Sequence, residues 1–237
     1  MHKCLRQRVG WWQLLIGLVA FMGTSWAGTI ETDVLQQPWP RQHVRHLEVG
    51  RAPVVWREYA SKREGIFAGV HFAAPLPQQQ AWDLANDYHD LGAATPGIVA
   101  VKFLEQTSMR QVIQIDAKVL WKRVRLVFEV EQEPPGAIRF QLVHHTLGTY
   151  RGLARFEPVR GTKTTGLTDA AEGTDIECMT WLKPARPVPM GLVLLAERIM
   201  LLRGVKSFLA QCEAQRRRAA RSAKVATSLV PVASLTL

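Results

Sequence analysis

Residues 187–215 read PVPMGLVLLAERIMLLRGVKSFLAQCEAQ, and this stretch decides the fold. No proline follows Pro189, and apolar residues recur at steps of three and four, which predicts a long helix from Pro189 to about Gln215. Glu197 and Arg198 interrupt the apolar run, so we do not expect this helix to cross a membrane. The core-facing stripe of the helix is predicted to contain Leu195, Ile199, Leu202, Val205, Leu209 and Cys212.

A long series of strand-like runs precedes this helix. Apolar and polar residues alternate over residues 121–131 and again over 137–145, which is typical of strands with one buried face. The loops between the runs are short, and this favours antiparallel pairing. An earlier strand at 65–72 is followed by two short helices, at 78–86 and about 87–91. We predict an α+β fold in which an antiparallel sheet of six or seven strands curves around the long helix and encloses a cavity.

The N-terminus has the features of a secretory signal peptide over residues 1–27. Three basic residues precede an apolar run at 14–22, and Ala27 ends a small-x-small motif. The apolar run is short for a hydrocarbon core of about 30 Å. We therefore expect cleavage after Ala27 and a periplasmic or secreted protein, with an uncleaved membrane anchor as the alternative.

The rest of the chain divides into three parts by composition. Residues 28–62 show no clear periodicity and contain three prolines, so they are predicted to form an N-terminal extension that lies over the domain. Residues 63–215 contain the strands and the long helix and form the domain. Residues 216–237 are rich in basic and small residues and are predicted to be a disordered tail.

The formal net charge of +10 is concentrated at the two ends of the chain. The basic residues of the signal peptide and of the tail account for most of it, so the domain itself is nearly neutral. A basic chain ordinarily suggests nucleic acid, but an exported protein seldom meets it, and we expect no nucleic-acid partner. The tail is a candidate for contact with anionic lipid headgroups, and a solvated tail is the alternative. Its basic residues are Arg216, Arg217, Arg218, Arg221 and Lys224.

Two cysteines, Cys178 and Cys212, remain after removal of the signal peptide. An oxidising compartment permits a disulfide, but the sequence does not show whether the two Cα atoms come within bonding range. A disulfide and two buried thiols therefore both remain open. No Cys/His spacing resembles a zinc site, and no Ser-His-Asp arrangement or phosphate loop is present. We expect no metal, no cofactor and no catalytic residue, although catalysis is not excluded.

Four stretches of the chain resemble the START-like, helix-grip superfamily, in particular its polyketide cyclase/dehydrase and coenzyme Q-binding-like proteins. The resemblance covers about residues 63–215 and rests on the order and spacing of the motifs. In the strand ARFEP at 154–158, Ala154 stands where the family often has tryptophan, which we expect to enlarge or reshape the cavity. The stretches are FAGVHFAAPLPQQQAWDLANDYHD at 67–90, TPGIVAVKFLE at 95–105, TYRGLARFEPVRGTKTTGLT at 149–168 and the helix at 187–215.

Arg198 is the first candidate for a ligand contact. A helical wheel places it among Leu194, Leu202 and Val205. A buried guanidinium without a partner is costly, so we expect it to meet a carboxylate, a polar ligand head or water at the cavity mouth. The alternative is an arginine that extends past its apolar neighbours into solvent.

Other candidate contacts follow from position. His144 ends a strand beside His145, so one of the two side chains faces the cavity. Tyr88 lies in the segment 88–90, where similar proteins often gate the cavity. The full set of predicted ligand-binding residues is Arg198, His144, Tyr150, Trp82, Tyr88, Phe140 and Leu202.

The resemblance implies a binding protein for an apolar or amphipathic small molecule, such as a lipid, an isoprenoid quinone or a polyketide-like compound. We interpret the chain as such a protein, exported and non-catalytic. Two alternatives remain open. An enzyme of the cyclase or dehydratase type would bring titratable groups together inside the cavity, and a structural or interaction protein would fill the cavity with its own side chains.

Overall fold

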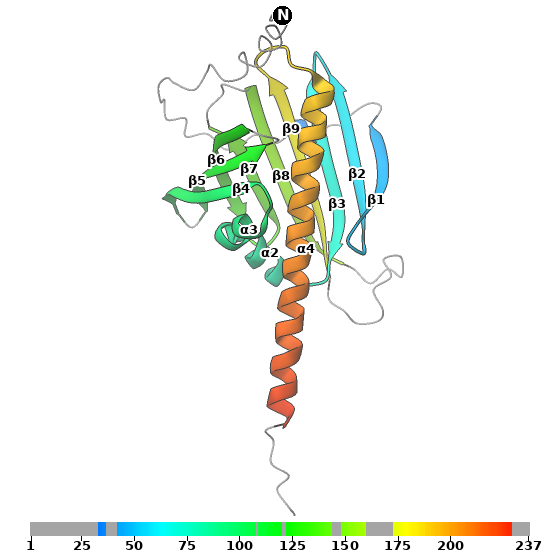
Figure 1. The fold of residues 1–237 in the computed structure, drawn as a ribbon, viewed down its shortest axis with the longest axis vertical. Coiled ribbons are helices and arrows are strands. Elements are labelled where there is room, and N and C mark those ends of the chain that lie inside the picture. The colour runs from blue at the N-terminus through cyan, green and yellow to red at the C-terminus, as the bar shows by residue number, and fades with distance from the viewer. Residues whose placement is uncertain are drawn as a thin grey trace, which may run out of the picture.

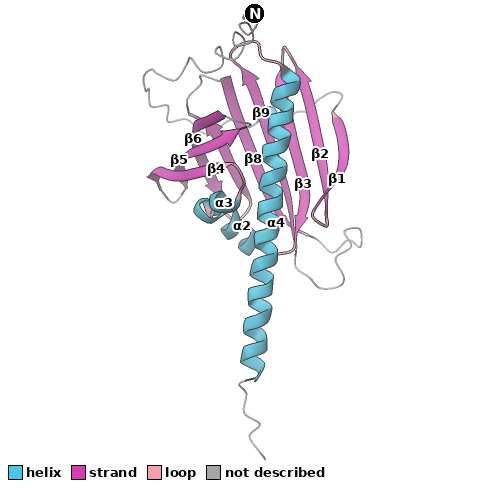
Figure 2. Ribbon diagram, viewed as in Figure 1, coloured by secondary structure: helices cyan, strands magenta, loops and turns pink. Residues whose placement is uncertain are grey.

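A computed structural model describes residues 33–36, 42–107, 109–119, 122–143, 148–159 and 173–228. The described chain forms one nine-stranded antiparallel sheet, and the long helix α4 lies across one of its faces (Figures 1 and 2). The predicted α+β helix-grip fold is confirmed. The elements are α1 (Asp33–Gln36), β1 (His43–Val49), β2 (Ala52–Ser61), β3 (Gly65–Ala74), α2 (Gln78–Asn86), α3 (Tyr88–Ala94), β4 (Ile98–Gln106), β5 (Arg110–Val119), β6 (Lys122–Glu133), β7 (Ala137–Leu142), β8 (Gly148–Pro158), β9 (Thr174–Pro184) and α4 (Met190–Ser228).

The strand order is β1-β2-β3-β9-β8-β7-β6-β5-β4. An early strand of the domain, β3, therefore lies beside its last strand, β9. β3 pairs with β9 along their whole lengths, from Ile66 opposite Leu182 to Ala74 opposite Thr174. All other pairs are hairpin neighbours in sequence. The β3–β9 pairing therefore brings the first strand-like run that the sequence predicts against the last.

β3 is buried on both of its faces, which explains its continuous apolar run. Its alternate residues Ala68, Val70 and Phe72 belong to the main core beneath α4. Phe67 points the other way and packs with Leu153, Met179 and the α1 residue Leu35 in a smaller cluster. The sheet thus has a main core on its α4 side and a second layer on its outer side.

Residues assigned to the N-terminal extension contribute two strands to the sheet. β1 and β2 form a hairpin, and β2 pairs with β3 from Val54 opposite Phe72 to Ser61 opposite Gly65. Val54 and Trp56 are fully buried in the main core. The prediction that this segment lies over the domain is wrong, and the strand count of six or seven is too low, because alternation in β2 is interrupted by Pro53 and by the polar Glu58 on its inner face.

The end of α4 differs from the predicted helix end. The helix was expected to stop near Gln215, but it continues to Ser228 and projects beyond the sheet (Figure 1). Glu213 and Arg217 form an i,i+4 ion pair at 2.9 Å, and the Ala, Arg, Gln and Lys residues of this part are good helix formers. The predicted disorder is therefore wrong up to residue 228, and the residues after it lie outside the described chain.

Two short helices place α4 against the sheet edge. Asp87 caps α3 by accepting a hydrogen bond from the Asp90 backbone N–H at 2.9 Å. Gly92 of α3 approaches Val101 of β4 so closely that an added Cβ would lie 2.6 Å from the valine Cγ2. In the part of the chain that the structure describes, no helix is both long enough and apolar enough to cross a bilayer.

Candidate functional site

The sheet, α3 and α4 enclose a cavity of about 360 Å³, within the usual range for small-molecule sites. Among the described residues that form its wall there is no Lys, Arg, His, Asp or Glu. The few polar groups in the wall are Tyr88, Thr95, Tyr150 and Cys178. The remaining wall residues are apolar: Val70, Phe72, Ala85, Gly92, Ile98, Val101, Ile113, Ile115, Phe128, Val130, Ile138, Phe140, Ala154, Phe156, Ile176, Met200, Leu201, Gly204, Val205 and Phe208.

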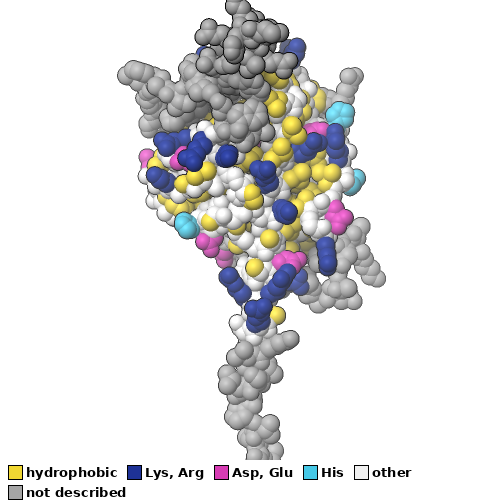
Figure 3. All heavy atoms as spheres, viewed as in Figure 1, with side chains coloured by type: hydrophobic (Ala, Val, Ile, Leu, Met, Phe, Trp, Pro, Cys, Tyr) yellow, Lys and Arg dark blue, Asp and Glu magenta, His cyan; other side chains and the backbone are white. Residues whose placement is uncertain are grey.

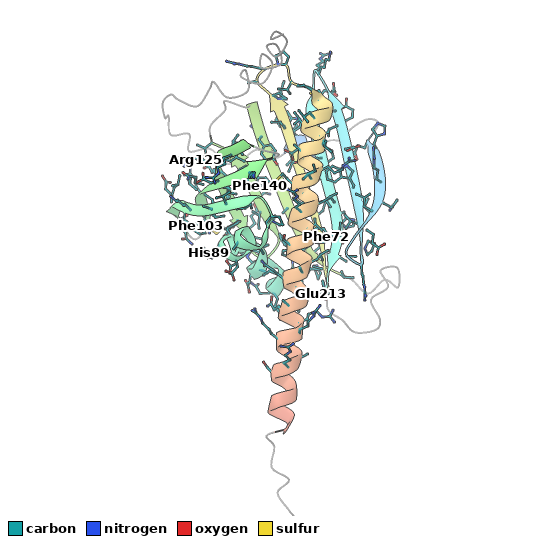
Figure 4. The ribbon with its side chains drawn as sticks, in the orientation of Figure 1. Phe72, His89, Phe103, Arg125, Phe140 and Glu213 are labelled. Atoms are coloured by element: carbon teal, nitrogen blue, oxygen red, sulfur yellow. The ribbon has the colours of Figure 1, made fainter. Side chains whose placement is uncertain are left out.

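Three aromatic rings form one corner of the cavity. Phe128 lies 6.0 Å from both Phe140 and Tyr150, measured between ring centroids, and Phe140 lies 6.3 Å from Tyr150. The edge-to-face arrangement of Phe128 against the other two rings is a favourable one. Figure 4 shows Phe140 and the wall residue Phe72 among the side chains between the sheet and α4.

Gly152 makes the position of Phe140 possible. The two residues lie directly opposite each other on β8 and β7. A Cβ on Gly152 would lie 1.9 Å from Cζ of Phe140, so any larger residue would displace the ring. The glycine lets the Phe140 ring lie across β8, and this fixes the aromatic corner next to Tyr150.

Gly204 leaves open space in the α4 wall of the cavity. A Cβ added at this position would meet no atom within 4 Å outside the helix backbone. Glycine in a helix interior costs about 1 kcal/mol relative to alanine, and no close neighbour requires it here. The helix therefore carries a stability cost at a position where a side chain would fill the cavity.

A buried carboxylate, Glu197 of α4, lies beside the aromatic corner. Its Oε2 atom accepts a hydrogen bond from the Tyr150 hydroxyl at 3.3 Å and one from Thr180 Oγ1 at 3.3 Å. Glu197 forms no salt bridge with any residue in the described ranges, and no basic group contributes to its titration. Tyr150 thus connects the cavity to an uncompensated buried acid.

Burial dominates the protonation of this group of residues. Desolvation raises the pKa of Glu197 to about 7, against the lowering effect of the hydrogen bonds from Tyr150 and Thr180. Desolvation and the nearby Glu197 charge raise the pKa of Cys178 to about 12, and the same two causes hold the pKa of Tyr150 well above its ordinary value. Near neutral pH, Glu197 exchanges its proton while Tyr150 and Cys178 keep theirs.

The structure brings three of the predicted contact residues together. Tyr88, Tyr150 and Phe140 all line the cavity. Ala154, which stands at the position where similar proteins often have tryptophan, also lies in its wall. The other predicted residues that the structure describes do not lie there, and their role in binding stays a prediction.

Each of the remaining candidates has a defined place. Trp82 packs in the core against Phe156, with ring centroids 5.5 Å apart. Leu202 packs at the margin of the core, and Arg198 is half-buried on the flank of α4, so neither forms part of the wall. His144 lies outside the described residues.

Glu197 is the functional residue that the sequence analysis missed. It was treated only as an interruption of an apolar helix. Yet it lies four residues before Leu201 and seven before Gly204, both of which face the cavity, so the helical period puts it on their side. The assumed stripe was rotated toward Arg198, because Leu195 and Leu202 were counted as core although Leu195 is 39% exposed.

Cys178 and Cys212 are both free thiols, which answers the open disulfide question for this structure. Cys212 is fully buried in the core beneath α4. Among the described residues no group of three His, Cys, Asp or Glu side chains is placed to hold a metal ion.

Comparison with known proteins agrees with this geometry. Residues 74–190 match the family model described as polyketide cyclase / dehydrase and lipid transport. No curated protein matches the chain significantly in sequence. The solved structures described next share 11–14% of their sequence with this chain, so they show the fold alone.

Three of these structures illustrate the range of the likeness. The Zhui aromatase/cyclase from Streptomyces sp. R1128 has a TM-score of 0.55 at 14% identity, over 65% of this chain and 96% of the other. The STAR-related lipid transfer protein from Xanthomonas axonopodis has a TM-score of 0.53 at 13% identity, over 73% and 98%. A START superfamily protein from Mycobacterium smegmatis has a TM-score of 0.53 at 11% identity, over 63% and 98%.

Proposed function

We propose that this chain, which resembles the START-like, helix-grip superfamily, is an exported binding protein for an apolar or amphipathic small molecule held between the sheet and α4. A lipid, an isoprenoid quinone or a polyketide-like compound fits this description. The observation that carries the proposal is the apolar cavity of about 360 Å³.

The composition of the cavity wall supports binding over a purely structural role. A structural protein would fill this space with its own side chains, whereas here Gly204 and Ala154 line it. Each square ångström of ligand surface buried there contributes roughly 25 cal/mol. Since no wall residue in the described part of the chain is a cation, the charged group of an amphipathic ligand would stay outside the cavity.

Native mass spectrometry of the protein recovered from its own compartment tests binding and export together. We expect a mature chain that begins at Gly28 and carries a non-covalent apolar ligand, which is lost on denaturation. A chain that still begins at Met1 would contradict cleavage after Ala27 and favour the uncleaved membrane anchor. A ligand-free protein that also takes up no apolar compound after delipidation would contradict binding.

A cyclase- or dehydratase-type enzyme is the second candidate, and Glu197 is the observation that favours it. Its pKa of about 7 suits a general acid or base, and Tyr150 connects it to the cavity. Polyketide turnover by the wild type that is abolished in Glu197→Gln would support this candidate over simple binding. No turnover of any cavity-sized polyketide would count against it.

The projecting end of α4 is proposed to contact anionic membrane surfaces. Arg216, Arg217, Arg218 and Arg221 are exposed there, and Figure 3 shows basic side chains gathered where the helix leaves the body. Each basic residue near such a surface contributes about 1 kcal/mol. We expect replacement of the four arginines by glutamine to weaken binding to vesicles containing phosphatidylglycerol by on the order of a hundredfold or more.

Vesicle co-sedimentation measures this effect, with pure phosphatidylcholine vesicles as the uncharged comparison. Glutamine is a good helix former, so the variant keeps its helix. Arg125→Gln is the control, because Arg125 lies on β6, away from α4 (Figure 4). Equal binding of the fourfold variant and the wild type to phosphatidylglycerol vesicles would exclude this surface contact.

A further inference from the structure

The hydrogen bonds at the aromatic corner say more about the chemical class of the ligand than the cavity volume does. The cavity offers a polar side chain at few places, and one of them, Tyr150, is held from behind by a buried acid. The ring of Tyr150 packs against the rings of Phe128 and Phe140. A ligand oxygen at this corner would meet Tyr150 while the rest of the ligand packs on aromatic faces.

We propose that Tyr150 is the hydrogen-bonding residue of the cavity and that Glu197 sets the direction of its hydrogen bond, so that the ligand is an uncharged aromatic molecule with one carbonyl or hydroxyl oxygen. This statement rests on the binding function proposed above. Tyr150 touches the ligand, and Glu197 acts through it as a positioning residue, since Glu197 itself is not part of the cavity wall.

No described residue of the wall carries a charge, and this argues against ionic ligand groups at this corner. A carboxylate or phosphate there would lie close to Glu197 with no cation to balance it. A cationic group in the cavity would have to pass Tyr150 to reach Glu197, because Glu197 lies behind Tyr150 and is not part of the cavity wall. An uncharged ligand oxygen needs no opposite charge nearby, and Tyr150 supplies its hydrogen bond.

The proton on Glu197 decides what Tyr150 can offer. When Glu197 is ionised, the Tyr150 hydroxyl donates to it, so the tyrosine oxygen is left to accept a bond from a ligand hydroxyl. When Glu197 is protonated, its own O–H can donate to the tyrosine oxygen, which frees the Tyr150 hydroxyl to donate to a ligand carbonyl. The corner therefore favours alcohols above the Glu197 transition and ketones below it.

Few other charges act on this pair among the described residues. From β9 the titratable group nearby is Cys178, which stays protonated. On β1 and β2, which α4 also contacts, Arg45 and Glu58 pair with each other at 3.2 Å. The charged side chains of α2 and α3 are exposed, and within α4 the adjacent Arg198 contributes nothing to the titration of Glu197. Those exposed groups are Asp83, Asp87, His89 and Asp90.

Three probes with one carbon skeleton test the inference. They are 2-acetylnaphthalene, its alcohol 1-(2-naphthyl)ethanol, and the oxygen-free 2-ethylnaphthalene, titrated by calorimetry at pH 5.5 and 8.5 on either side of the Glu197 transition near pH 7. In the wild type we expect the affinity ratio of ketone to alcohol to fall between the two pH values. In Glu197→Gln, which has a donor and an acceptor at every pH, we expect a constant ratio.

Tyr150→Phe removes only the hydroxyl from the corner. We expect it to weaken both oxygenated probes roughly three- to tenfold and to leave 2-ethylnaphthalene unchanged. Tyr59→Phe is the matched control, because Tyr59 bonds Glu64 and packs in the outer cluster of the sheet, outside the cavity wall. It should alter neither the affinities nor the pH-dependent ratio.

The outcomes separate the two proposals. Suppose that the wild type binds 2-ethylnaphthalene. If Tyr150→Phe then changes the affinity for no probe, or if the ketone-to-alcohol affinity ratio of the wild type is the same at both pH values, this inference is overturned and the binding function stands. If the folded wild type binds none of the three probes, the binding function fails and the inference fails with it. Thermal melts of each variant confirm that the comparison is made on folded protein.

Discussion

Replacing Gly204 by leucine is expected to stabilise the protein and to weaken apolar ligand binding roughly ten- to hundredfold. The stabilisation comes from the higher helix propensity of leucine, about 1 kcal/mol, and from burial of its side chain in space that is now empty. The loss of affinity comes from the same atoms, which would occupy volume that the ligand needs. A change that improves folding and impairs binding is a strong sign that the space serves the ligand.

Thermal melts and displacement of the uncharged fluorophore N-phenyl-1-naphthylamine measure the two effects. Gly191→Leu is the matched control, because Gly191 also lies on α4 with no atom within 4 Å of an added Cβ, but is exposed and outside the cavity wall. The control should bind the fluorophore as the wild type does. Wild-type affinity in Gly204→Leu would place the ligand elsewhere, and a large loss of stability would show that the space is not open.

The fold was predictable because its local signals agree with one another. Alternation in β6 and β7, short turns and a proline-free apolar helix each point to a sheet around a helix, and the nine-stranded sheet confirms this. The strands at the N-terminal edge of the sheet, β1 and β2, were harder to predict. β2 carries Glu58 on a buried face, where Arg45 and Trp56 compensate it across and along the strands, and such partners are visible only after the strands are paired.

The location of the cavity could be predicted from the sequence, but the acid beside it, Glu197, could not. Aromatic residues such as Phe140 and Tyr150 stand out in alternating strands, and the structure places both in the wall. The orientation of α4 decides whether residue 197 or 198 faces the sheet. A helix turns about 100° per residue, so an error of one position exchanges a buried acid for a half-buried base. Sequence periodicity cannot fix that angle when apolar residues such as Leu195 also lie on the exposed side.

The buried acid gives the last prediction, a loss of stability as the pH rises. The pKa of Glu197 is about 7 in the folded protein, above its ordinary value of 4.5, so the folded state binds this proton more tightly than the unfolded chain. The resulting stability is present below about pH 4.5 and disappears as the pH passes 7. As the pH rises from 5 to 8, we expect ionisation of Glu197 to lower the free energy of unfolding by on the order of 2–3 kcal/mol.

Urea unfolding at several pH values measures this loss, and Glu197→Gln removes it, because glutamine keeps the hydrogen bonds without a titrating proton. The variant should match the wild type near pH 5 and exceed its stability near pH 8. Glu213→Gln, an exposed position on the same helix that pairs with Arg217, should keep the wild-type pH dependence. Parallel curves for the wild type and Glu197→Gln would mean that Glu197 is ionised throughout, and Tyr150 would then face a permanent acceptor and bind only ligands that donate a hydrogen bond.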